Sequence, residues 1–163
     1  MTGIPTVNSH ILFVYELSAI ACIAGFAAYD LKKKRVPDRA LRLFLPFALA
    51  APMIRTGVFG TALLPLLFLY SFMGAAAGFV ILLAAAMLSR EGAGIGGGDI
   101  KLAAAMGFIY GPSRMLAILL IASGLAACVS LAVKCRRKNE MLSLPFVPFL
   151  MVGSLAVTVT AIL

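Results

Sequence analysis

The sequence has few charged residues and few of the residues that build metal or disulfide sites. Only 12% of its 163 residues are charged, and it holds three cysteines, one histidine and no tryptophan. Three cysteines without a CxxC spacing predict neither a disulfide framework nor a cysteine zinc site. We therefore expect the protein to use no metal and no other cofactor.

Apolar residues dominate instead. They make up 63% of the chain, whereas soluble domains are about half apolar and about a quarter charged. A soluble core of this length could not bury so much apolar surface, because a small domain leaves much of its surface exposed. A lipid bilayer is therefore the expected solvent. The formal net charge of +8 then indicates a membrane face and no nucleic-acid partner.

The apolar residues fall into segments that predict an all-α bundle of about six transmembrane helices. At roughly 20 residues per span, such a bundle uses most of the chain and predicts a single integral-membrane domain over residues 1–163. The segments cover residues 11–29, 40–54, 63–88, 100–110, 115–133 and 142–163.

The basic residues predict how this bundle is oriented. If the N-terminus lies outside, the loops and margins after the first, third and fifth segments hold every Lys and Arg except Arg55 and Arg114. Basic residues concentrate on the cytoplasmic side of membrane proteins. We therefore expect a multi-pass protein of the cell (inner or plasma) membrane with both termini outside.

Two glycines indicate close helix packing. Gly74 and Gly78 form a GxxxG pattern within the third segment, and small residues at this spacing let helix backbones approach each other. The pattern favours packing within the bundle, with a homodimer through the same face as the alternative.

Two acidic residues at the predicted cytoplasmic face are candidates for chemistry, because ionisable residues in or beside spans are usually functional. Asp30 ends the first segment, directly before a basic run. Asp99 follows three glycines, Gly96 to Gly98, and opens the fourth segment. The alternatives are a solvated carboxylate that neutralises the basic run, for Asp30, and an N-cap of the next helix, for Asp99.

Taken as a pair, these two carboxyl groups suit peptide hydrolysis. Two carboxylates close together in a low-dielectric site do not both ionise easily. One stays an anion that can activate water, and the other keeps a proton and can polarise a peptide carbonyl. This is the arrangement of aspartic proteases. The glycines would let an extended peptide lie against the backbone beside Asp99.

These motifs resemble those of the type IV prepilin peptidases and the archaeal preflagellin peptidases, which are six-helix membrane aspartic proteases of the GxGD class. The segment from Gly96 to Leu102 is similar to the family's GxGDxKL motif. Asp30 is followed by Pro37 and Asp38, like the family's first aspartate, and residues 144–150 resemble the proline-bearing start of its last helix. The three motifs occur in the family's order.

The resemblance implies that Asp30 and Asp99 are the catalytic pair. It implies supporting or substrate-binding roles for residues around them, namely Gly96, Gly98, Lys101, Pro37 and Asp38. The expected partner is a prepilin-like protein whose short basic leader is cut at the cytoplasmic membrane face. Many bacterial relatives carry cysteine pairs that accompany N-methylation. Because this sequence has no CxxC, we expect peptidase activity without a methyltransferase domain.

Two alternatives remain. A presenilin-like or signal-peptide-peptidase-like protease shares the Tyr29-Asp30 and GxGD pair, but that family has more helices than 163 residues supply. A small transporter or assembly subunit could use its acids to bind cations or protons. Such acids are expected near the middle of the bilayer, whereas these lie at one predicted face.

Overall fold

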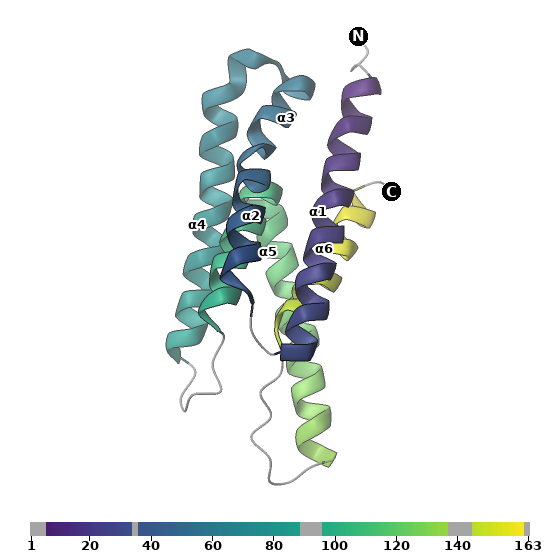
Figure 1. The fold of residues 1–163 in the computed structure, drawn as a ribbon, viewed down its shortest axis with the longest axis vertical. Helices are drawn as coiled ribbons and strands as arrows, with labels where there is room; N and C mark the ends of the chain where they lie inside the picture. Colours follow the sequence, from purple (N-terminus) through teal and green to yellow (C-terminus); the bar gives the residue numbers. More distant parts are fainter. Residues whose placement is uncertain (1–5, 34–35, 89–95, 137–144, 162–163) are drawn as a thin grey trace.

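The computed structural model describes residues 6–33, 36–88, 96–136 and 145–161, and every element in these residues is helical. The predicted all-α fold is therefore confirmed for this part of the chain. Figure 1 shows the helices side by side in an elongated bundle. They are α1 (Thr6–Lys33), α2 (Asp38–Leu49), α3 (Ala51–Phe59), the short 3-10 helix η1 (Thr61–Leu63), α4 (Leu64–Leu88), α5 (Gly97–Arg136) and α6 (Val147–Thr160).

Four stretches of these helices are long and apolar enough to cross a membrane, whereas α6 is apolar but shorter. Large apolar side chains such as Leu43, Leu88 and Leu120 are exposed, as expected for helices that face lipid on one side. The prediction of about six spans and of both termini outside is not settled by this count and stays a prediction. The four stretches are His10–Lys33, Asp38–Phe59, Thr61–Leu88 and Gly97–Ala132.

The long helix α5 is interrupted at Gly111. This residue has φ 78° and ψ 173°, and Pro112 follows it. Such dihedral angles are open almost only to glycine, and proline lacks the N–H that would continue the helix. In Figure 1 the two ends of α5 lie toward the same end of the bundle, so the chain reverses direction at this point. The break falls in the gap between the predicted segments 100–110 and 115–133.

The GxxxG face of α4 packs against the first half of α5. A side-chain carbon on Gly74 would collide with the carbonyl oxygen of Gly107, and one on Gly78 would lie 2.5 Å from the carbonyl oxygen of Ala103. Both glycines are buried. Within the single chain, this face is therefore covered by α5.

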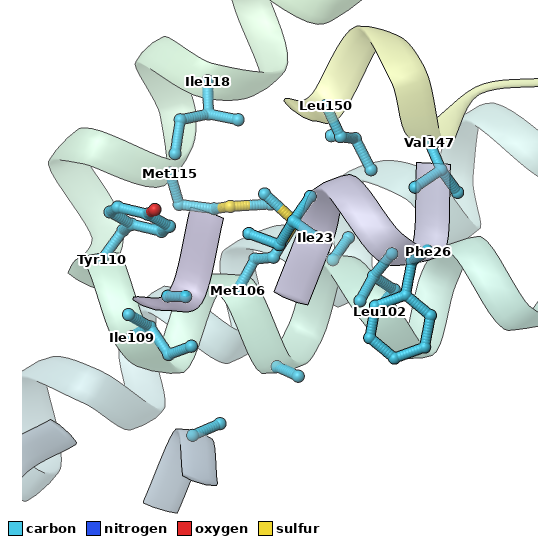
Figure 2. Close-up of a cluster of buried hydrophobic side chains, with 14 of the residues drawn as sticks. Ile23, Phe26, Leu102, Met106, Ile109, Tyr110, Met115, Ile118, Val147 and Leu150 are labelled. Carbon is cyan, nitrogen blue, oxygen red and sulfur yellow. The ribbon is translucent and has the colours of Figure 1, made fainter. Parts of the chain in front are cut away.

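A hydrophobic core joins α1, both halves of α5 and α6. Figure 2 shows side chains from these helices meeting between them. This packing sets the end of α1 beside the start of α6. The labelled members are Ile23, Phe26, Leu102, Met106, Ile109, Tyr110, Met115, Ile118, Val147 and Leu150.

Some predicted boundaries differ from the structure. The first helix continues through Lys33, so Asp30 lies within its last turn and not at its end. The segment 40–54 corresponds to two helices that meet at Ala50, and the second of them continues to Phe59. The last helix begins at Val147, and the predicted residues 142–144 and 162–163 lie outside the described part of the chain.

Candidate active site

Asp30 is a buried carboxylate held against the start of another helix. Its side chain is only 3% exposed. The backbone N–H of Val147 donates a long hydrogen bond of 3.4 Å to Oδ2 of Asp30. Val147 is the first residue of α6, where backbone N–H groups have no partner within the helix. The start of α6 therefore orients the carboxyl group of Asp30.

Asp99 lies in the first turn of α5 and not at its N-cap. Its backbone N–H donates to the carbonyl oxygen of Gly96 over 2.9 Å, and its side chain accepts a hydrogen bond from the backbone N–H of Gly96. This reciprocal pairing resembles a capping box, in which the third helical residue reaches back to the N-cap. The side chain is 9% exposed, so its position is fixed inside the bundle.

Asp30 and Asp99 lie at the same end of the bundle. A side-chain carbon on Gly98, the residue before Asp99, would lie 2.8 Å from Cβ of Val36 in the segment that follows Asp30, and both carboxyl groups are buried. The packing of these two segments therefore places the two acids near each other. Two neighbouring carboxyl groups sheltered from bulk solvent can bind a water molecule, and one group can then accept a proton from it while the other donates a proton to a substrate.

The glycines before Asp99 have different surroundings. A side-chain carbon on Gly98 would lie 2.8 Å from Cβ of Val36, so this glycine accommodates the chain's own segment after α1. By contrast, among the described residues, a side-chain carbon on Gly97 would meet nothing within 4 Å, and one on Gly96 would meet only the Asp99 carboxyl group. Open space beside the backbone thus exists at Gly96 and Gly97, while Gly98 links the two aspartate-bearing segments.

Pro37, Asp38 and Lys101, the other predicted supporting residues, lie at the starts of α2 and α5, and Asp38 and Lys101 are exposed. Pro37 is the N-cap of α2, and Asp38 is in its first turn. Asp38 Oδ1 lies 3.2 Å from Nζ of Lys101, and both side chains are well exposed. Exposed ion pairs stabilise a fold by little. Asp38 and Lys101 also line a cavity of about 640 Å³ between α2, α4 and α5.

Within the described ranges, no cluster of three His, Cys, Asp or Glu side chains has the geometry to hold a metal ion.

Sequence reasoning did not identify two features of the molecule. The first is the hydrogen bond from the backbone N–H of Val147 to Asp30. Residues 144–150 were recognised as a motif, but no contact with Asp30 was predicted for them. The other is Arg55, which was predicted only as an outside charge. It is buried in α3 at the far end of the bundle, close to an ion pair of 2.6 Å between Glu16 and Arg114.

Comparison with known proteins agrees with the motifs. A model of the type IV leader peptidase family matches residues 17–131, a range that includes both Asp30 and Asp99. A prepilin leader peptidase/N-methyltransferase from Bacillus subtilis (strain 168) is 37% identical over 139 residues. That alignment covers 83% of this chain and 51% of the relative, so the chain spans about half the length of that protein. No solved structure matches the chain. The matched family model covers most of the chain and contains the two buried aspartates, and the chain therefore belongs to the type IV leader peptidase family.

Proposed function

We propose that the protein is a membrane aspartic endopeptidase that removes the short basic leader from type IV prepilin-like proteins at the cytoplasmic face of the membrane. Membership of the leader peptidase family supports the reaction and the substrate class. The observation that carries the mechanism is the pair of buried carboxyl groups, Asp30 and Asp99, on two segments that the contact between Gly98 and Val36 holds together.

In the proposed reaction, one carboxylate is ionised and the other carries a proton. The ionised group takes a proton from water as the water oxygen attacks the carbonyl carbon of the scissile bond. The protonated group gives its proton to the carbonyl oxygen, which forms a tetrahedral diol. Collapse of the diol breaks the C–N bond, and a proton passes to the leaving amine. Each carboxyl group is then ready for another cycle after proton exchange with water.

The surroundings of the pair suit an extended peptide. The backbone at Gly96 and Gly97 is exposed and has open space beside it, so a leader could lie along it. The contact between Gly98 and Val36 holds the segment after Asp30 against the segment before Asp99. Pro37, Asp38 and Lys101, at the starts of α2 and α5, would contact other parts of the substrate. The apolar helix that follows a leader would pack against the lipid-facing surface.

The proposal is tested by co-expressing the full chain with a prepilin and sequencing the N-terminus of the product. Asp30→Asn and Asp99→Asn keep the size of each side chain and remove its ionisation. We expect either change to slow leader removal by at least about a hundredfold, because acid–base catalysis contributes on that scale. Membrane insertion and thermal unfolding should be unchanged.

Glu16→Gln is the matched control. It also removes a buried carboxylate from α1, but Glu16 is paired with Arg114 and not with Asp99. We expect this variant to keep leader removal. Near-normal cleavage by Asp30→Asn or Asp99→Asn would remove that residue from the catalytic pair, and near-normal cleavage by both would refute the aspartic mechanism.

A further inference from the structure

A second cavity, of about 410 Å³, lies far from the two aspartates. Glu16 lines it and precedes Asp30 by 14 residues on α1, which is roughly 21 Å at about 1.5 Å per residue. The wall of the cavity is mostly apolar and comes from α1, α3, η1, α4 and α5. Its charged members are Glu16, Arg55 and Arg114.

Arg55 is the unusual member of this wall, because it is a cation that is only 7% exposed. Its Nη2 donates to the carbonyl oxygen of Ile109, and its guanidinium carbon lies 5.6 Å from the centre of the Tyr70 ring. Its Nη1 is buried and has no hydrogen-bond acceptor among the described residues. A buried donor without an acceptor costs free energy, more so when it is charged. The site therefore lacks a negatively charged acceptor.

The charges around the cavity do not balance. Glu16 accepts a hydrogen bond of 2.6 Å from Nη1 of Arg114, so its single negative charge is already paired with one of the two arginines. With Glu16 ionised, the three side chains carry one net positive charge. One monovalent anion would balance them, and the planar guanidinium groups suit an acceptor with several oxygens.

We propose that this cavity binds one anionic phospholipid, with its phosphodiester against Arg55 and Arg114 and an acyl chain along the apolar wall. A phosphodiester carries a single negative charge and offers oxygens to both guanidinium groups. The apolar wall of the cavity suits an acyl chain, which would bury apolar surface there. Glu16 and Arg55 both lie inside candidate spans, so the cavity that they line would lie at the depth of the membrane.

The test is native mass spectrometry of the full chain, purified in detergent and mixed with equal amounts of phosphatidylglycerol and phosphatidylcholine. Phosphatidylglycerol, which has one net negative charge, should be retained preferentially as a one-to-one complex. Arg55→Gln and Arg114→Gln should each weaken its binding by at least about tenfold, as expected for the loss of a hydrogen bond to a charged group.

Two control variants make the result specific. Arg39→Gln removes the same charge from an exposed position at the start of α2 and should leave binding unchanged. Glu16→Gln removes the competing negative charge and should tighten binding. If the two substitutions merely damaged the structure, Glu16→Gln and Arg114→Gln would both weaken binding. Opposite changes in the two variants therefore indicate a direct effect of charge. Arg114 is 37% exposed, so this pair of variants keeps the test valid if Arg55→Gln does not fold.

Several results would overturn the proposal. One is equal retention of phosphatidylcholine and phosphatidylglycerol. Another is a loss of binding in Glu16→Gln as large as in Arg114→Gln, which would assign both residues to folding. Displacement of the lipid by millimolar inorganic phosphate would show a site for small anions. Asp30→Asn should bind the lipid normally, so this test is independent of the proposed peptidase reaction.

Discussion

Asp30 and Asp99 each bind a backbone N–H at the start of a helix. For Asp99 it is the start of its own helix, α5, and for Asp30 it is the start of α6. The N–H of Gly96 precedes α5 and bonds to Asp99, while the N–H of Val147 opens α6 and bonds to Asp30. The first N–H groups of a helix have no internal partner and are free to bind an acceptor. Two different helix starts therefore orient the two carboxyl groups.

The sequence made the aspartates easy to find but not their partners. Acids are rare in this chain and stand out beside apolar segments, so Asp30 and Asp99 were predicted from their residue type, their position and the motifs around them. The role of Val147 depends on a backbone N–H, which every residue except proline has. Only the packing of α6 against α1 selects it. The burial of Arg55 was not predicted, because the second apolar segment was expected to end at residue 54, whereas α3 continues to Phe59.

At the residue scale, Gly98→Ala tests whether the contact with Val36 positions the two aspartates that we propose as the catalytic pair. The added carbon would lie 2.8 Å from Cβ of Val36, so the segment after Asp30 must shift. We expect the free energy of unfolding to fall by about 1–3 kcal/mol, as for other overpacked sites, and leader cleavage to slow. Thermal unfolding and the cleavage rate measure the two effects.

Gly97→Ala is the matched control for this prediction. It adds the same carbon one residue earlier, where none of the described residues lies within 4 Å, and alanine favours helix over glycine by about 1 kcal/mol. The free energy of unfolding should therefore be retained, while cleavage is expected to slow because the leader is proposed to lie along Gly97. Equal thermal stability of the two variants would contradict the proposed role of the Val36 contact.

At the scale of helices, the sequence predicted which segments are helical better than where they end. The first apolar segment stops before the basic run, but α1 continues to Lys33 because lysine is a good helix former and cations are favourable in a last turn. By contrast, Gly111 and Pro112 were predicted as a gap between segments, since both residues interrupt helices. The reversal of α5 there follows from dihedral angles that only the structure gives.

The packing of α4 on α5 leads to a prediction about Gly74. A side-chain carbon at this position would collide with the backbone of Gly107 and Gly111, and backbone atoms cannot move aside as a flexible side chain can. Gly74→Ala should force the two helices apart and lower the free energy of unfolding by about 1–3 kcal/mol or more. Denaturation in detergent, followed by circular dichroism, measures the loss.

Gly124→Ala provides the comparison. Gly124 lies in the second half of α5, is exposed, and would place its new carbon in open space. Because alanine has the higher helix propensity, this variant should be as stable as the unmodified protein or slightly more stable. If Gly74→Ala were equally stable, the close approach of α4 and α5 would be wrong.

At the scale of the whole molecule, the two ends of the bundle have different chemistry. The aspartate pair lies where α1 ends and α5 begins, and the cavity with Arg55 lies near the start of α1. Exposed apolar side chains cover much of the surface between them. The sequence predicted the first end from motifs and the middle from composition. It did not predict the cavity at the other end, because Glu16, Arg55 and Arg114 come from three separate helices and belong to no recognised motif.

The orientation of the bundle is the last prediction, and it depends on the basic residues. Apart from Arg55 and Arg114, they lie in the predicted inside loops and margins, which should therefore face the cytoplasm. Single cysteines test this in a variant with Cys22, Cys128 and Cys135 replaced by alanine. Arg39→Cys marks the start of α2 and Thr61→Cys marks η1, and both positions are exposed. An impermeant maleimide should label Thr61→Cys in intact cells and Arg39→Cys only after permeabilisation. The opposite pattern would invert the bundle, and labelling of both from one side would show that α2 and α3 together do not cross the membrane.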